Sequence, residues 1–159
     1  HAANARQAMA LSASVAQELQ RRSDPAEAAQ KPGPRVVVLV DDHHILGSGG
    51  DDPLGPLIPF LPSARDLRLH VFLTRPVAGS TRASFDLGLQ SLRETGGTGI
   101  VMSGERSEGQ VFPRVYAEQM IPGRGRIVRR GRPPAVVHLA HFPSRDEQPV
   151  DGARSDHAS

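Results

Sequence analysis

The 159-residue sequence contains no cysteine and no tryptophan, and it has only one lysine and one tyrosine. Without cysteine, the chain cannot form a disulfide framework, a zinc ribbon, an iron–sulfur cluster or a thiol nucleophile. It also lacks an apolar run approaching the roughly 18 residues that a transmembrane helix needs, and the basic-then-apolar start of a secretory signal. These absences predict a soluble, cytoplasmic domain of α/β or mixed content.

The sequence also has little net charge. The 19 basic residues face 17 acidic ones, which leaves a net charge of +2. A chain that binds nucleic acid needs several uncompensated cations, so this balance argues against nucleic-acid binding. Glycine and proline are abundant, at 16 and 14 residues, and predict many turns.

Hydrophobic periodicity predicts alternating helices and strands. Ser84 is expected to cap one helix, which Gly96 and Gly97 should terminate. The expected helices cover residues 2–22, residues 53 or 54 to 62–66, and the segment between residues 84 and 96. The expected strands cover residues 35–40, 70–74, 99–102, 126–130 and 135–141.

The order of these elements predicts a mostly parallel sheet with right-handed crossovers. Residues 36–40 are apolar throughout, which is typical of a strand covered on both faces. The last two strands flank a GRPP turn and should form a hairpin. We therefore expect a helix at residues 1–23, a folded portion at residues 35–142 and a disordered polar tail at residues 143–159.

Ligands of such sheets bind where the strands end, so the residues after each strand are the candidates for a site. Asp41 and Asp42 follow the apolar run directly. This is the form of a Walker B strand, in which one carboxylate holds the Mg²⁺ of a nucleotide and the next acid orients water. The alternative is structural, because aspartate often begins a turn after a strand.

Polar residues also stand after the next strand and beside the aspartate pair. Thr74 is placed to sense a γ-phosphate or the water near it, whereas Arg75 can equally be a solvated loop charge. His43 and His44 lie next to the aspartates, but adjacent side chains diverge, so we do not expect these four residues to form a zinc site.

The phosphate-binding part of a nucleotide site is missing from this sequence. No Gly-x-x-x-x-Gly-Lys-[Ser/Thr] motif occurs, and Lys31, the only lysine, precedes a proline. Neither Gly-x-Ser-x-Gly nor Gly-x-Gly-x-x-Gly occurs either, so serine-hydrolase and dinucleotide chemistry lack their motifs. A Walker B strand alone is half a site.

A long ordered series of segments resembles the FtsK/SpoIIIE ATPase family. The series comprises residues 36–46, 53–75, 77–86, 89–97, 100–104 and 122–133. The resemblance covers roughly residues 8–142, and within the family it is closest to the last of the tandem ATPase domains of EccC, the motor of type VII secretion. It implies a RecA-like P-loop NTPase, an α/β three-layer sandwich, of which this chain holds only the C-terminal part.

The same resemblance assigns roles to the candidates. Asp41 corresponds to the Walker B aspartate and would ligate the metal. Asp42 stands where active members carry the longer glutamate, so it is a catalytic candidate in a site expected to be degenerate. Thr74 takes a sensor position as the second catalytic candidate, and Arg75 would contact the cofactor. ATP and Mg²⁺ are expected to bind only with the missing Walker A half.

The implied function is a module of a type VII secretion ATPase that contributes the Walker B side and helps recognise exported substrates. The alternatives are a FtsK-like DNA translocase module and a catalytically inactive interaction scaffold. The arginine-rich residues 124–132 recur in the family motif, which favours a structural hairpin there and no nucleic-acid partner. The chain alone is expected to be inactive as an ATPase.

The resemblance also implies partners and a location. The expected partners are the remaining part of the same ATPase domain, other EccC-like ATPase domains and small helical secreted substrates. The expected location is cytoplasmic, at the inner face of the cell membrane within a secretion complex, with membrane contact only through other parts of that complex.

Overall fold

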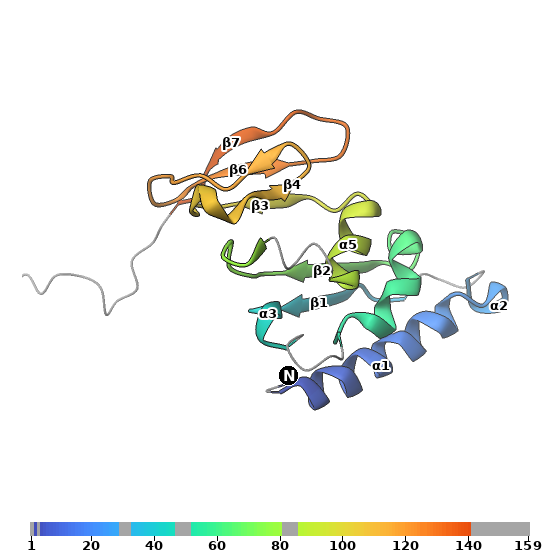
Figure 1. The fold of residues 1–159 in the computed structure, drawn as a ribbon. Coiled ribbons are helices and arrows are strands. Elements are labelled where there is room, and N and C mark those ends of the chain that lie inside the picture. The colour runs from blue at the N-terminus through green and yellow to red at the C-terminus, as the bar shows by residue number, and fades with distance from the viewer. Residues whose placement is uncertain (1, 3, 29–32, 47–51, 81–85, 141–159) are drawn as a thin grey trace, which may run out of the picture.

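A computed structural model gives the fold of the chain (Figure 1) and describes residues 2, 4–28, 33–46, 52–80 and 86–140. The tail predicted at residues 143–159 lies outside these ranges. Among the helices in the described ranges, none combines the length and the apolar character needed to cross a bilayer.

Helices and strands follow one another largely as the periodicity predicts. The helices are α1 (Ala5–Arg22), α2 (Pro25–Ala28), α3 (His43–Leu46) and α5 (Leu87–Glu94), with the 3₁₀ helices η2 (Gly55–Ser63) and η3 (Arg106–Glu108). The strands are β1 (Val36–Val40), β2 (Leu69–Leu73), β3 (Gly99–Val101), β4 (Gln110–Phe112), β5 (Val115–Tyr116), β6 (Arg124–Val128) and β7 (Ala135–His138).

Helix α1 begins and ends through local capping. The Asn4 side chain accepts the N–H of Gln7 at 3.0 Å, and Ser23 closes the last turn. The inward face of α1 presents Leu19, which is completely buried against η2. Burying a leucine of this kind contributes about 1.5–3 kcal/mol relative to leaving it exposed. The core comprises Leu19, Leu54, Leu57, Leu61, Leu67 and Leu69.

The second predicted helix is η2, a 3₁₀ helix. Pro56, Pro59 and Pro62 recur at every third residue, and none has an N–H to donate. A helix with three residues per turn places these prolines along one edge. The remaining positions carry Leu57 and Leu61, which are buried in the core.

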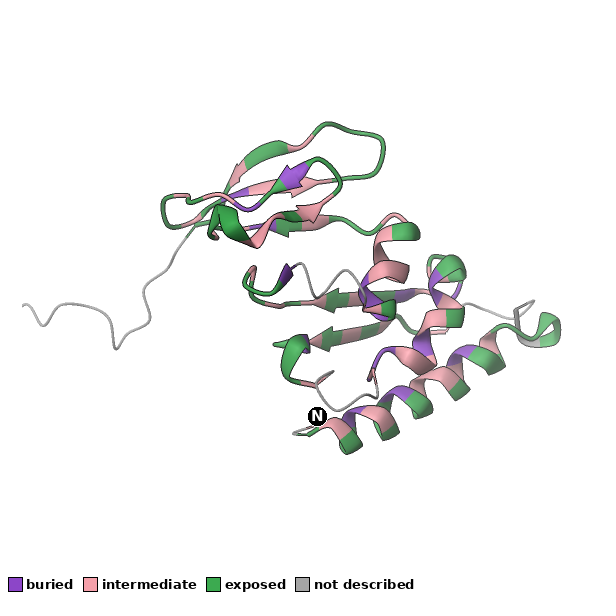
Figure 2. Ribbon diagram, viewed as in Figure 1, coloured by how far each residue is buried: buried purple, intermediate pink, exposed green. Residues whose placement is uncertain are grey.

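Strands β1 and β2 form a parallel pair that is in register over all five residues of each strand, which confirms the parallel arrangement predicted for them. The expected cover on both faces is wrong for the described residues. Val37, Leu39 and Phe72 are 55%, 74% and 57% exposed, because α1 and η2 pack on the other face only. Figure 2 shows these exposed positions alternating with partly buried ones along both strands.

Strand β3 does not join this pair among the described residues, although a third parallel strand was predicted there. It pairs antiparallel with β6, which pairs antiparallel with β7. The predicted hairpin is thereby confirmed as β6–β7. In Figure 1 the β3–β6–β7 sheet and α1 lie on opposite sides of the β1–β2 pair. The short β4–β5 pair was not predicted.

Helix α5 begins later than predicted. Its N-cap is Asp86, whose Oδ1 accepts the N–H of Leu89 at 2.9 Å, and Ser84, the predicted cap, lies outside the described residues. Serine and aspartate cap helices about equally well, so the sequence alone did not separate them. Gly96, with φ 90°, follows the helix end as expected.

Candidate functional site

The carboxyl ends of β1 and β2 bring three of the four predicted site residues together. The Thr74 hydroxyl donates to Asp41 Oδ1 and accepts the N–H of Asp42 at 3.0 Å. The parallel pairing makes this contact possible, because the N–H of Thr74 continues the ladder to the carbonyl of Val40 at 2.9 Å. The two turns after the strands are therefore joined by one side chain.

The Thr74 hydroxyl has a single hydrogen, which Asp41 accepts, so in this structure Thr74 orients the Asp41 carboxylate. Asp42 has φ 48°, in the left-handed region that aspartate tolerates better than most residues. Both aspartates are exposed, so a ligand arriving from solvent can reach them.

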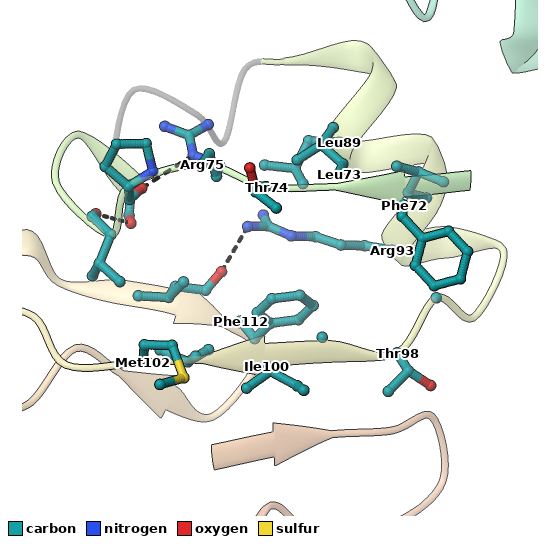
Figure 3. Close-up of a pocket in the computed structure, with 18 of the residues that line it drawn as sticks. Phe72, Leu73, Thr74, Arg75, Leu89, Arg93, Thr98, Ile100, Met102 and Phe112 are labelled. Atoms are coloured by element: carbon teal, nitrogen blue, oxygen red, sulfur yellow. Dashed lines mark hydrogen bonds between the residues drawn. The ribbon is translucent and has the colours of Figure 1, made fainter. Parts of the chain in front are cut away.

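Arg75, the fourth predicted residue, turns toward its own loop. Its guanidinium makes long contacts to the carbonyls of Pro76 and Gly79, at 3.4 and 3.5 Å. Burial lowers the pKa of Arg75, and the charge of Asp86 partly opposes that effect. Arg75 also lines a cavity beside β2 (Figure 3).

This cavity has a volume of about 480 Å³ and lies between β2, α5, β3 and β4. Arg93 of α5 extends into it: Nη2 donates to the carbonyl of Val111 at 2.6 Å, and the guanidinium lies 4.8 Å from the Phe112 ring centroid. Burial and then the nearby charge of Arg75 lower the pKa of Arg93. The Nε of Arg93 is buried without a hydrogen-bond partner, so the cavity holds a donor that lacks an acceptor.

The arginine-rich residues 124–132 lie on and after β6. Arg126 donates to Glu118 at 2.5 Å, and Arg124 donates to His138 of the neighbouring strand at 3.0 Å. These contacts support the structural role that was predicted for the segment.

Sequence reasoning set His43 aside as a zinc ligand and missed Asp52 and Asp86, which the structure places beside it. His43 is 1% exposed, whereas His44 is exposed. Its Nε2 lies 3.2 Å from Asp52 Oδ1 and its Nδ1 lies 3.4 Å from Asp86 Oδ2. No short motif connects these three residues, so only the fold brings them together.

Asp52 anchors this group. Its Oδ1 accepts the N–H of Leu54 at 2.9 Å, and its Oδ2 accepts the N–H of Gly88 at 3.1 Å. Burial raises the pKa of Asp52, but the hydrogen bond from His43 and the two backbone N–H groups outweigh burial and hold the pKa below its ordinary value. The carboxylate is therefore ionised at neutral pH and joins α3, η2 and α5.

Comparison with known proteins gives relatives of one kind. No protein-family model matches the chain. The ESX-4 secretion system protein EccC4 of Mycobacterium tuberculosis is 37% identical over 111 residues, which are 70% of this chain and 9% of EccC4. The ESX secretion system protein EccC of Thermomonospora curvata is 33% identical over 109 residues, 69% of this chain and 8% of that protein. The chain thus spans less than a tenth of the length of these relatives.

Comparison with solved structures gives EccC proteins as well. The cytoplasmic domain of the Thermomonospora curvata type VII secretion ATPase EccC superimposes with a TM-score of 0.80 and 28% identity, over 90% of this chain and 18% of that one. Thermomonospora curvata EccC (ATPases 2 and 3) in complex with a signal sequence peptide gives the same TM-score over 27% of its length. Sequence and fold together show that this chain belongs to the EccC-like ATPases of type VII secretion and forms part of an ATPase domain of that family.

Proposed function

We propose that this chain contributes the Walker B side of a nucleotide site in an EccC-like secretion ATPase. The observation that carries the proposal is the Asp41–Thr74 contact at the carboxyl edge of the β1–β2 pair, in a chain whose relatives are ESX secretion proteins. Carboxylate oxygens are the protein ligands that Mg²⁺ prefers, so Asp41 fits that ion. When bound, Mg²⁺ neutralises charge on the nucleotide phosphates.

The other candidates support this site from their own positions. Thr74 holds the Asp41 carboxylate in one orientation. Asp42 is exposed beside it and would orient water, from a shorter reach than glutamate has. Arg75 would approach phosphate oxygens once its weak contacts to its own loop are exchanged for them.

The remaining part of the same ATPase domain would pack where the described strands lack neighbours. Within the described residues, β2 pairs only with β1 and β3 only with β6, and the cavity separates these two strands. Buried backbone groups along a strand edge need partners. We expect a strand from the remaining part to insert there and to supply an acceptor for the Nε of Arg93. Further elements would cover the exposed face of β1 and β2.

Titration calorimetry with Mg-ATP tests the proposal on this chain and on a longer protein that adds the rest of the domain. The chain alone should not bind tightly, because affinity for a triphosphate comes chiefly from the amides and lysine of a phosphate loop, and this sequence has no such motif. The longer protein should bind, and Asp41→Asn should weaken the Mg²⁺ dependence of binding.

Asp66→Asn is the matched control, because Asp66 is an exposed aspartate at the opposite end of β2. It should leave Mg-ATP binding unchanged. Micromolar binding by the chain alone would show that the nucleotide lies elsewhere.

We also propose that the complete domain helps recognise exported substrates. The solved complex of Thermomonospora curvata EccC with a signal sequence peptide supports this role. A helical segment would present apolar anchors at i, i+3 and i+4 to an apolar groove. Pull-down of the complete domain against small helical substrates, with and without their last residues, tests the idea. Equal recovery of both forms would contradict it.

A further inference from the structure

His43, Asp52 and Asp86 form a cluster outside the proposed nucleotide residues. One ligand atom from each lies within 4.8 Å of the others. The His43 side chain is 1% exposed, whereas the side chains of Asp52 and Asp86 are 25% and 21% exposed. The imidazole is therefore enclosed by protein, and a small ion can reach the group from the carboxylate side.

Asp52 determines which nitrogen of His43 carries hydrogen. An ionised carboxylate only accepts hydrogen bonds, so the Nε2 of His43 must be the donor to Asp52 across 3.2 Å. Proteins usually orient a metal-binding imidazole through a carboxylate that accepts a hydrogen bond from the ring nitrogen that does not bind the metal.

The other ring nitrogen of His43, Nδ1, lacks a hydrogen-bond partner. It is buried and lies 3.4 Å from Asp86 Oδ2. Asp86 Oδ1 accepts the N–H of Leu89 as the cap of α5, so Oδ2 is the oxygen that faces the ring. A buried ring nitrogen that faces a carboxylate oxygen without a hydrogen bond offers two ligand atoms to a cation.

The separation of these two atoms fits two ligands of one metal ion. Two ligands of a tetrahedral zinc ion, each about 2.0–2.1 Å from the metal, lie about 3.3 Å apart. The observed 3.4 Å between His43 Nδ1 and Asp86 Oδ2 agrees with the metal. We propose that His43 and Asp86 bind a divalent cation of the zinc class, with water completing its coordination and Asp52 orienting the imidazole.

Zinc chloride titrated into the 159-residue chain tests this proposal, followed by calorimetry and by the imidazole nitrogen resonances. One zinc ion should bind per chain and shift the Nδ1 resonance of His43. Asp86→Asn should weaken zinc binding by at least about tenfold, and Asp52→Asn by about 10- to 100-fold as the loss of an orienting carboxylate. Asparagine caps a helix as well as aspartate does, so Asp86→Asn keeps the start of α5.

His44→Gln is the control, because His44 is the exposed neighbour of His43. It should bind zinc like the wild type. Circular dichroism of each variant verifies the fold. Equal zinc affinity in Asp86→Asn and wild type would overturn the proposal. An Nδ1 resonance that does not shift at millimolar zinc would also overturn it and identify a structural ion pair.

Discussion

Single side chains hold the turns after β1 and before α5. Thr74 joins the backbone of Asp42 to the carboxylate of Asp41, and His43 lies between Asp52 and Asp86. Both contacts start from the same few residues after β1. A substitution in either turn should therefore alter the contacts at the start of α5. The same helix carries Arg93, which lines the cavity.

Gly88 is the residue that lets Asp52 approach α5. A Cβ at this position would lie 2.5 Å from Asp52 Oδ2 and 3.1 Å from Leu54. In an open helix, Gly→Ala gains up to about 1 kcal/mol, but overpacking costs about 1–3 kcal/mol. We expect Gly88→Ala to lower the free energy of unfolding in urea by about 1 kcal/mol or more, because the clash displaces a partly buried, hydrogen-bonded carboxylate.

Gly55→Ala provides the comparison for this variant. A Cβ at Gly55 meets no atom within 4 Å, so this change should not destabilise the protein. If Gly88→Ala is as stable as Gly55→Ala, Asp52 is free to move and does not anchor α5.

At the scale of elements, α1 is held to the domain by its inward face. Leu19 is completely buried in the core that α1 shares with η2. Leu19→Ala should cost about 2–5 kcal/mol of unfolding free energy, because it removes buried methyl groups and leaves a cavity. Leu11→Ala on the same helix is the control, and it should cost less than about 1 kcal/mol, because Leu11 is 49% exposed. Similar losses in both variants would mean that α1 propensity matters more than its packing.

The last turns of α1 also carry a pH-dependent contribution. Hydrogen bonds from Arg21 and Arg22 hold the pKa of Glu18 at about 2, below its ordinary 4.5. A carboxyl whose pKa is lowered on folding stabilises the folded state above its unfolded pKa. That stabilisation is lost as the pH falls from about 4.5 to about 2.

Glu18→Gln should therefore flatten the loss of unfolding free energy across this pH range. Measurement of urea unfolding at several pH values tests the prediction. The effect should shrink at high salt, because the pair is exposed to solvent. Glu94→Gln, at the end of α5, is the matched control. A slope that is unchanged by Glu18→Gln would mean that the arginines act through packing alone.

At the scale of the whole molecule, the exposed apolar face of β1 and β2 should matter more for association with the rest of the domain than for the stability of this chain. Leu39 is 74% exposed, so Leu39→Asn should change the unfolding free energy of the chain by less than about 0.5 kcal/mol. If the remaining part of the domain covers this face, the same change should weaken association with that part.

Titration calorimetry between the two parts measures this association. Ile45→Asn is the control, since Ile45 is 61% exposed but lies on α3 instead of the strand face. Unchanged association in Leu39→Asn would place the rest of the domain on another surface.

Local sequence pattern determined much of the fold. The helical recurrence predicted α1, the apolar runs predicted β1 and β2, and the GRPP turn predicted the β6–β7 hairpin. The pattern also placed Asp41 and Thr74 at the ends of neighbouring strands, where the structure joins them. Periodicity, caps and turn residues act over a few neighbours, so the sequence displays them directly.

Tertiary structure decided what depends on distant partners. The pairing of β3 with β6 and the enclosure of His43 between two aspartates have no signature in the residues near each one. A buried polar group is satisfied by whichever atoms the packed elements bring to it, and a strand pairs with whichever edge is free. Those outcomes depend on the packing of the whole chain, so they became visible only in three dimensions.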